Sequence, residues 1–599
     1  MSEPMALPTI AARWLRGRQW LSRAWPLLLV LAIFAGTALI VPSLTPVATT
    51  DDWGYSRSVE ILLDEGRLTV YPVVAATAVF QIGWGAAFGL VFGMSLGIVR
   101  VSTLVIVMLG AAALYGLLRE LGVRRGRSAL GTAAYLFNPL LFVLSFTFMT
   151  DSFLTSLIVG SAYCSVRGLK GTTVDWRYLV AGSALAACAF LTRQQGILVP
   201  VAIGSFLLLT RRLRFDWASV KLLLAIAGIP ALALGGYYVW LSTVNDIPAV
   251  QASFTQEMQR AGLAGTWRLG WNLLFIVAMY LGFFTAPLVA AVLIGWLPRL
   301  RQGTRRGVPL VLPWLAIPWV GGLVGGLVLY GYAGKRWPYI PQFVNAAGLG
   351  PSDVLGSRTR LFGATTFAWS TAICAIAALI VALVVSRGVG LPPSGERTAA
   401  GIVAAIVVWQ FVGVLPPSFH YLRRGYSLDR YLLPLLPLII CLVLWAARDL
   451  RLPQAVGWAL IAGLIAYNVA ATRDYLTFLD TVWTSADEVV AQGVPATSVD
   501  AGAGWDGYHL YTYGLDHDIT RARTRNGPWW MTFYALASDS TYVVSSTPRD
   551  GYKIMWTRTY DQWLVGGDVT LYVLRRADAP ALPDAATDPS AYLRRWSGG

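Results

Sequence analysis

Long apolar stretches recur through the first 470 residues, and they limit the possible folds of this chain more than any other feature. About thirteen of them are long or apolar enough to cross a membrane as helices. Only 13% of the residues are charged, against about 25% in a typical soluble protein. We therefore expect an α-helical polytopic membrane protein. The expected spans lie near residues 26–41, 101–118, 129–146, 152–166, 178–191, 197–210, 220–241, 272–295, 308–331, 364–385, 399–415, 430–447 and 455–470.

The loops between these spans divide by charge, and the division predicts the orientation. Alternate loops are basic, as in "RELGVRRGR" (119–127) and "RLRQGTRR" (299–306). The positive-inside rule places these loops and the N-terminus in the cytoplasm, and an odd number of spans leaves the C-terminus outside. The net charge of +16 then reflects topology, and nucleic-acid binding is not expected.

Residues 73–99 are apolar enough to span, but counting them as a span would reverse every later loop and remove the charge bias. We expect them to form interfacial helices within a first extracytoplasmic loop, 42–100. Gly85, Gly89, Gly93 and Gly97 recur every fourth residue and predict a close-packing helix face. Dimerisation of a transmembrane helix is the alternative reading of these glycines.

The last part of the chain differs from the rest in composition. Residues 472–599 are polar and contain strand-like pieces such as "TYVVSS" and "VTLYVLRR". We expect a small extracytoplasmic α/β domain here, after a membrane domain at 1–471. All four cysteines lie in apolar runs, which indicates buried thiols and not a disulfide framework.

Two adjacent carboxylates follow the first span directly, in "TTDDWGYSRSVEILLDEGRL" (49–68). Paired carboxylates repel each other, and they are costly to hold near hydrocarbon. Asp51 and Asp52 therefore point to a function outside the lipid. The alternative is a helix cap for the stretch 53–66, which has helical spacing and ends at Gly66.

Further ionisable residues fall on the same predicted face. Asp151 lies in "FTFMTDSF", Arg193 in "LTRQQG", Lys335 and Arg336 in "YAGKRWPY", and Arg430 in "DRYLLPLLP". A helix cap for Asp151, a headgroup contact for Arg193 and interfacial anchoring for the 335–336 pair are the simpler explanations. Arg430, at the end of an apolar span, requires an anionic partner such as a lipid phosphate or Asp429.

Carboxylates and cations at an extracytoplasmic mouth suit sugar transfer from a lipid phosphate. The isoprenoid tail would stay in the bilayer, arginine or lysine would bind the phosphate, and a carboxylate would deprotonate the acceptor hydroxyl. A transporter of lipid-linked sugars would instead place ionisable groups at the bilayer midplane, where the predicted spans have almost none. A non-catalytic glycan-binding subunit is a third possibility.

Several motifs, in this order, resemble those of a known group of enzymes. "D-D-x-x-Y" after the first span, "NPLLFVLSFTFMTDSF", "FLTRQQG" and "DRYLLPLLP" look like the GT-C superfamily of polyprenyl-phosphate-sugar-dependent glycosyltransferases. The resemblance is to the family 39-like bacterial branch, which includes protein O-mannosyltransferases and the aminoarabinose transferase. It covers the chain to about residue 470.

The resemblance implies roles for individual residues. It implies Asp51 as the catalytic base of an inverting transfer, with Asp52 and Asp151 as further acidic site residues. The implied phosphate-binding residues are Arg430, Lys335, Arg336 and Arg193. The implied acceptor- or sugar-binding residues are Tyr55, His420 and Tyr421. The lysine common after the first loop of relatives is absent from "AATAVFQIGWG", and no proline of the mannosyltransferase kind follows Asp151, so protein mannosylation is not favoured.

No metal or cofactor is predicted. His420, His509 and His517 are the only histidines, and no Cys/His spacing typical of a zinc site occurs. A divalent cation bound by the acidic residues stays an alternative. The expected partners are a polyprenyl-phosphate-linked sugar, a glycan, lipid or protein acceptor, and membrane lipids. The expected location is the plasma membrane of a bacterium.

Overall fold

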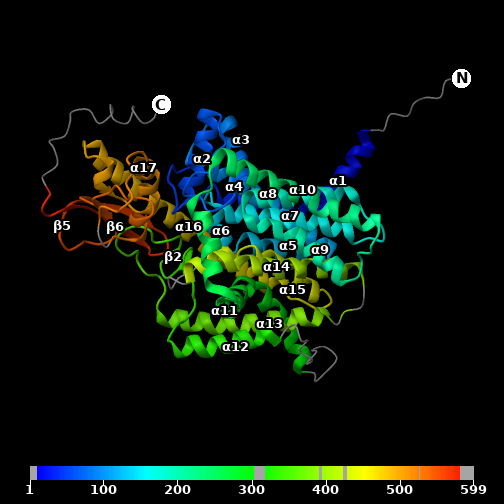
Figure 1. Ribbon diagram of the computed structural model, residues 1–599. Helices are drawn as coiled ribbons and strands as arrows, with labels where there is room; N and C mark the ends of the chain where they lie inside the picture. Colours follow the sequence, from blue (N-terminus) through cyan, green and yellow to red (C-terminus); the bar gives the residue numbers. More distant parts are fainter. Residues whose placement is uncertain are drawn as a thin grey trace.

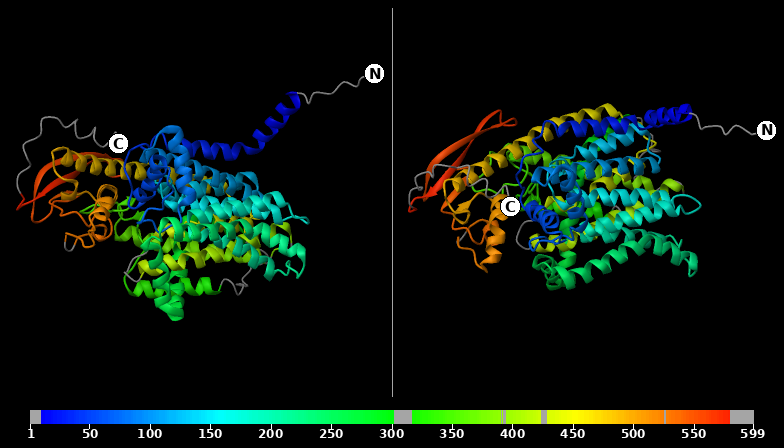
Figure 2. Two further views of the ribbon diagram at one scale, coloured as in Figure 1. Left: turned by 45° about the horizontal axis from the view of Figure 1, so that its top comes forward. Right: turned by 90° about the horizontal axis from the view of Figure 1, so that it is seen from above.

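The computed structural model describes residues 10–301, 317–389, 391, 394–422, 428–524 and 527–579. Its helices run mostly side by side, and a small sheet domain lies at one end of the bundle (Figures 1 and 2). The helices are α1 (Ile10–Thr37), α2 (Asp52–Glu65), α3 (Val79–Phe92), α4 (Leu96–Glu120), α5 (Arg125–Leu136), α6 (Pro139–Ser145), α7 (Thr150–Leu169), α8 (Trp176–Thr192), η1 (Gln194–Ile197), α9 (Leu198–Leu209), α10 (Trp217–Trp240), η2 (Leu241–Asn245), α11 (Ala249–Arg301), α12 (Ile317–Tyr332), α13 (Ala364–Val389), α14 (Gly395–Leu422), η5 (Asp429–Leu432), α15 (Leu435–Ala446), α16 (Gln454–Ala491), η6 (Ala496–Ser498), α17 (Ala503–Asp516) and η7 (Trp529–Thr532).

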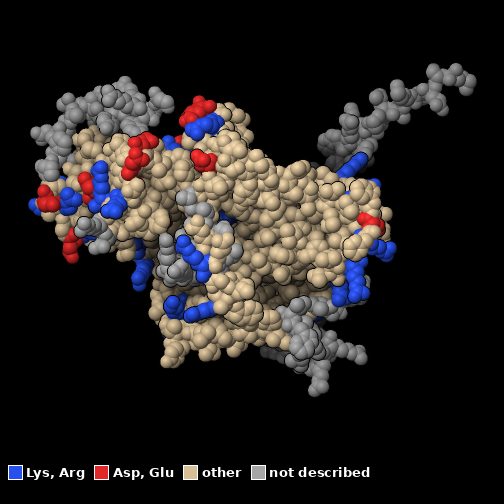
Figure 3. All heavy atoms as spheres, viewed as in Figure 1, with Lys and Arg blue, Asp and Glu red and all other residues tan. Residues whose placement is uncertain are grey.

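The helical bundle has the length and composition of a membrane domain. Figure 3 shows a broad surface band almost without charge, between charged groups at its two ends. In the described part of the chain six helical segments are long and apolar enough to cross a membrane, or seven if the bent pair α5 and α6 counts as one span. The predicted polytopic helical fold is therefore confirmed, whereas the number of thirteen spans stays a prediction. The six segments are Leu96–Glu120, Trp217–Asn245, Gln259–Trp296, Ala364–Gly388, Gly395–Ser418 and Gln454–Ala491.

The segment after the first helix folds into two short helices before the next long one begins. α3 has 14 residues, so at about 1.5 Å per residue it is shorter than a membrane core. Gly85 and Gly89 on α3 lie against side chains of α2, and a Cβ on Gly97 would lie 2.5 Å from the carbonyl oxygen of Leu44. Gly93 instead ends α3, with a φ of 84°. Three of the four spaced glycines thus serve close packing within this segment.

A buried arginine holds the chain that leads to Asp51. The Arg100 guanidinium on α4 is 1% exposed and donates hydrogen bonds to the carbonyl oxygens of Ser43, Thr45 and Val47, at 2.6–2.9 Å. Buried carbonyl groups without a donor are costly. Arg100 therefore fixes an irregular segment that has few backbone partners of its own.

The C-terminal part contains a mixed four-stranded sheet with the order β3-β4-β6-β5. β3 and β4 are parallel, and the other neighbours are antiparallel. The predicted strands "TYVVSS" and "VTLYVLRR" correspond to β4 and β6, so the small α/β domain is confirmed. A separate two-stranded hairpin, β1 and β2, follows α12. The strands are β1 (Val344–Asn345), β2 (Gly348–Leu349), β3 (Val499–Asp500), β4 (Tyr542–Ser545), β5 (Tyr552–Gln562) and β6 (Gly567–Arg576).

One helix joins the bundle to the sheet domain. α16 continues without interruption through position 471, where the sequence predicts the domain boundary. Near its middle the Asp474 carboxylate accepts hydrogen bonds from the backbone N–H groups of Trp563 and Leu564, at 2.8 and 2.9 Å. The sheet domain is thus attached along the side of the helix that carries it, and the predicted boundary stays a prediction.

Replacing Arg100 tests whether it fixes the segment before Asp51. Arg100→Met keeps the length of the side chain but removes the donor from the carbonyl groups of Ser43 and Val47, at about 1–3 kcal/mol each, while Thr45 keeps a hydrogen bond from the Val47 N–H. We expect a clearly lower unfolding temperature in detergent. Arg125→Met, which removes an exposed arginine on the neighbouring α5, is the control and should leave the unfolding temperature nearly unchanged. Equal unfolding temperatures for the two variants would contradict the role given to Arg100.

Candidate active site

Four charged side chains from separate parts of the sequence meet at the end of the bundle nearest the sheet domain. Asp51 immediately precedes α2, and Asp151 lies in the first turn of α7. Arg193 lies between α8 and η1, and Arg430 lies in η5, just before α15. The charges of the loops predict that all four lie on one face of the membrane, and the structure brings them into contact.

The four side chains alternate in charge. Two guanidinium nitrogens of Arg430 donate to the two carboxylate oxygens of Asp51, at 3.0 and 3.2 Å. The Nε atom of Arg430 lies 3.8 Å from a carboxylate oxygen of Asp151. The other oxygen of Asp151 accepts a hydrogen bond from Arg193 at 2.9 Å. The order Asp51–Arg430–Asp151–Arg193 balances two negative and two positive charges.

Burial distinguishes the members of this cluster. The Arg430 and Asp151 side chains are 5% and 2% exposed, and Arg193 is 10% exposed, whereas Asp51 is 23% exposed. Removing ions from water is costly unless each is paired and hydrogen-bonded. Asp51 is therefore the member that solvent or a ligand can reach, and the other three charged side chains are buried.

Aromatic groups line the cluster. The Arg193 guanidinium lies over the Tyr431 ring, 4.5 Å from its centroid. Tyr55 on α2 is buried, and its electrostatic neighbours are the four charged residues. Burial first, and Asp51 second, raise the pKa of the Tyr55 hydroxyl above its usual range. Tyr55 therefore stays neutral at physiological pH and can act only as a hydrogen-bonding group.

The two adjacent aspartates have different surroundings. The Asp52 carboxylate is 3% exposed and accepts hydrogen bonds from the Thr49 backbone N–H (2.6 Å), the Thr49 hydroxyl (2.7 Å) and the Phe148 backbone N–H (3.2 Å). Burial raises the pKa of Asp52 to about 6, although these hydrogen bonds oppose the rise. Asp52 thus ties the Asp51 segment to the segment between α6 and α7.

The simpler cap explanations do not describe Asp51 and Asp151. Asp51 stands at the position before α2, but its side chain makes no capping hydrogen bond and pairs with Arg430. The Asp151 side chain likewise pairs with Arg193. The predicted end of the first-loop helix is confirmed, because Gly66 follows α2 with a left-handed φ of 67°.

Asp429, the residue before Arg430, binds the loop between α12 and α13. Its carboxylate accepts hydrogen bonds from the backbone N–H groups of Gln342, Phe343 and Val344, at 2.9–3.4 Å. These residues belong to the long connection between α12 and α13. Asp429 therefore serves this loop, and the carboxylate that pairs with Arg430 is Asp51.

The same connection carries Asp353, an acidic residue that the sequence analysis did not identify. The Trp529 indole nitrogen lies 3.4 Å from its carboxylate, and its backbone oxygen accepts a hydrogen bond from Ala503 of α17 at 2.8 Å. Burial, and to a lesser degree Asp51, raise the pKa of Asp353 to about 6. Its sequence context, "GPSDVLG", signals only a turn, so no local pattern could have revealed it.

The other predicted site residues have different positions. Arg336 is exposed and donates to the carbonyl oxygen of Ala364, and Lys335 is exposed beside it. Within the described residues no contact joins either of them to the four-residue cluster. The side chains of His420 and Tyr421 lie outside the described part of the structure. No group of three or more potential metal ligands occurs among the described residues.

The fold and this cluster together define a multi-pass helical membrane protein with a buried charged centre at one end of its bundle. Residues 82–234 match the family described as dolichyl-phosphate-mannose-protein mannosyltransferase. The match confirms the resemblance to GT-C glycosyltransferases over this part of the chain, which includes Asp151 and Arg193. It supports a glycosyltransferase that uses a lipid-phosphate donor. Comparison with curated proteins gave no match.

Two solved structures are among those that this chain matches. One is ArnT from Cupriavidus metallidurans bound to undecaprenyl phosphate, at 13% identity and a TM-score of 0.40, covering 93% of this chain and 100% of that one. The other is the oligosaccharyltransferase AglB from Archaeoglobus fulgidus in complex with an inhibitory peptide and a dolichol-phosphate. Its identity is 13% and its TM-score 0.38, covering 80% of this chain and 59% of that one.

The pKa of Asp353 predicts a pH-dependent stability. Between about pH 4 and 6 the folded chain keeps a proton that the unfolded chain has lost, because the pKa rises from 3.8 to about 6 on folding. Stability is therefore lost as the pH rises through this range. Asp353→Asn, which stays neutral, should raise the unfolding temperature at pH 8 by roughly 2 °C and change it little at pH 4.5.

Thermal unfolding in detergent between pH 4.5 and 8 measures this difference. Asp550→Asn, at an exposed position of the sheet domain, should show no such pH dependence. A lower unfolding temperature for Asp353→Asn at pH 8 would contradict the prediction and would mean that the hydrogen bond from Trp529 requires the charged carboxylate.

Proposed function

We propose that this protein is an integral membrane glycosyltransferase that moves a sugar from a polyprenyl-phosphate donor to an extracytoplasmic acceptor. The observation that carries the proposal is the Asp51–Arg430 pair, in which a partly exposed carboxylate is held by a buried arginine fork at one end of the bundle. In this arrangement Arg430, which could bind a phosphate, is in direct contact with Asp51, which could act as a base.

The donor phosphate would bind where Asp51 now holds Arg430. A guanidinium presents two parallel donors to a phosphate as readily as to a carboxylate. Arg193, fixed through Asp151, adds positive charge beneath the same place. The isoprenoid tail would lie along the side of the bundle, where Figure 3 shows a broad surface almost without charge.

Phosphate binding would release Asp51 to act as the base. Asp51 removes the proton from the acceptor hydroxyl as that oxygen bonds to the anomeric carbon. The bond between this carbon and the phosphate oxygen breaks, and the electron pair leaves with the polyprenyl phosphate. The two arginines stabilise the charge that develops on the leaving phosphate. A single displacement of this kind inverts the anomeric configuration.

The remaining residues would support these steps. Asp151 balances the two arginines, and Asp52 fixes the position of the Asp51 segment. Tyr55 would donate a hydrogen bond to the sugar or phosphate. Lys335 and Arg336, and His420 and Tyr421, stay proposed contacts for the donor and acceptor. We further propose the bacterial plasma membrane as the location, with the N-terminus in the cytoplasm and the sheet domain outside.

The distribution of charge favours an enzyme over a transporter. A transporter of lipid-linked sugars would place ionisable groups midway along the bundle. The described cluster instead lies at one end, beside the sheet domain. A non-catalytic subunit on the same scaffold would not need Asp51, and the following experiment separates these functions.

Asp51→Asn tests the base directly. Wild type and variant, purified in the same detergent, would be assayed for release of polyprenyl phosphate from a panel of polyprenyl-phosphate sugars with cell-envelope extract as acceptor. We expect kcat to fall by at least about 100-fold, because a base of this kind contributes roughly 10²–10⁴-fold. Donor binding should be kept, because Arg430 remains and loses its competing carboxylate.

The matched control is Asp568→Asn, at an exposed position of the sheet domain, which should keep full activity. Arg430→Gln should instead weaken donor binding. Full turnover by Asp51→Asn would assign the base to another residue. Absence of turnover by folded wild type with every donor would favour the transporter or the non-catalytic subunit.

A further inference from the structure

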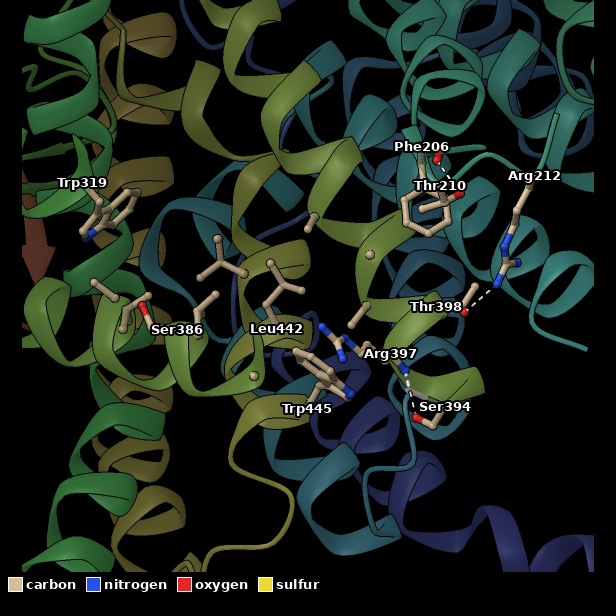
Figure 4. A pocket seen from close by; sticks show the side chains of 18 residues that line it. Phe206, Thr210, Arg212, Trp319, Ser386, Ser394, Arg397, Thr398, Leu442 and Trp445 are labelled. Atoms are coloured by element: carbon tan, nitrogen blue, oxygen red, sulfur yellow. Dashed lines mark hydrogen bonds between the residues drawn. The ribbon is translucent and has the colours of Figure 1, made fainter. Parts of the chain in front are cut away.

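A large cavity lies at the end of the bundle opposite the charged cluster. It has a volume of about 760 Å³, within the usual range of about 300–1,000 Å³ for ligand sites. The ends of α9, α13 and α15 and the start of α14 surround it (Figure 4). Arg430 precedes α15 and Trp445 lies near its end, so at about 1.5 Å per residue roughly 20 Å separates the two sites.

The walls of this cavity are mostly apolar. Phe206, Trp319, Val381, Leu442 and Trp445 are among the residues that line it. Several further positions are alanine or glycine, and these leave the space open between the four helices. Such a lining suits hydrocarbon chains and offers little to a polar solute.

Two arginines and several hydroxyl groups form one side of the cavity. Arg212 donates to the Thr398 hydroxyl at 2.9 Å, and Arg397 donates to the carbonyl oxygen of Leu391 at 2.7 Å. Figure 4 shows Arg397 directed toward Trp445, and Arg212 beside Thr398. Each guanidinium has further N–H groups available.

These arginines have no carboxylate partner among the described residues. The nearest acidic residue in sequence, Glu396, pairs with Lys170 at 3.7 Å. Within the described part of the chain, no carboxylate therefore neutralises the positive charge at the cavity. An apolar space with two free cations at its edge is complementary to an anionic, amphipathic molecule.

We propose that this cavity binds an anionic phospholipid of the leaflet opposite the Asp51 mouth. The phosphate contacts Arg212 and Arg397, and part of the acyl chains fills the space between α13, α14 and α15. The cavity opens at the end of the bundle that carries the basic loops, which the positive-inside rule places in the cytoplasm. Basic pockets between membrane helices on the cytoplasmic side suit lipid headgroups. This site is separate from the proposed transfer reaction and holds if that proposal fails.

Lipid binding to the purified full-length protein tests the proposal. The protein would be exchanged into lipid-free detergent and titrated with phosphatidylglycerol, or with phosphatidylcholine of the same chains, and bound lipid counted by native mass spectrometry. We expect phosphatidylglycerol to bind more tightly than phosphatidylcholine. Arg212→Gln/Arg397→Gln should weaken phosphatidylglycerol binding on the order of tenfold to thirtyfold, since each arginine contributes about fivefold.

Arg177→Gln/Arg214→Gln is the matched control, because both are exposed arginines at the same end that do not line the cavity. Its affinity should stay within about twofold of wild type. Ala404→Phe, which fills the cavity and keeps both arginines, should also weaken binding. The unfolding temperature of each variant shows whether it is folded.

Three results would overturn the proposal. The double variant at 212 and 397 could bind phosphatidylglycerol as well as wild type does. Phosphatidylcholine could bind wild type equally well, which would mean that charge is not recognised. Polyprenyl phosphate could displace phosphatidylglycerol from wild type at equal concentration, which would assign the cavity to the isoprenoid lipid.

Discussion

The contact on which the rest of the molecule depends is the pairing of Asp51 with Arg430 above the buried pair of Asp151 and Arg193. Each of these ions alone would be costly to hold at a site with little water. Together they reach neutrality only if the ends of α2, α7, α8 and α15 meet within a few ångströms. The helical bundle is thus arranged so that its ends converge on one small charged centre.

The surrounding segments fix this centre through hydrogen bonds to irregular backbone. Arg100 binds three carbonyl groups before Asp51, Asp52 binds the segment between α6 and α7, and Asp429 binds three N–H groups of the loop after α12. Irregular backbone near a membrane must find such partners, because lipid provides none. Several charged residues beside the site therefore stabilise the loops that form it by hydrogen bonds to their backbone.

Part of this arrangement could be predicted from the sequence. Hydrophobicity locates the helices, and the charges of the loops place Asp51, Asp151, Arg193 and Arg430 on one face, although these motifs did not enter the topology. The division of roles between Asp51 and Asp52 could not be predicted, because neighbouring residues face different partners only once the chain has folded. Asp353 was missed for a similar reason: its surroundings come from Thr50, Trp529 and Ala503, which are distant in sequence.

The hydrophobic pattern of the sequence also predicts the ends of some helices incorrectly. The long apolar helix near residue 100 begins at Leu96, because the Ser95 hydroxyl caps it by accepting a hydrogen bond from the Ile98 backbone N–H. α16 extends past residue 470, where the sequence predicts the end of the last span, because Asp474 binds the connection after β5 and buried side chains such as Leu476 and Phe478 pack in its second half. Tertiary contacts override composition at both places.

The uninterrupted course of α16 has a mechanical consequence. A helix of 38 residues is about 57 Å long, and it behaves as a stiff rod that begins among the membrane helices and ends beneath the sheet. The sheet domain therefore cannot swing about a flexible tether. In the proposed reaction, an acceptor would therefore have to enter beside a domain that is held in place. In that reaction the fixed position of the sheet domain, and not the closing of a lid, would limit the size of the molecules that reach Asp51.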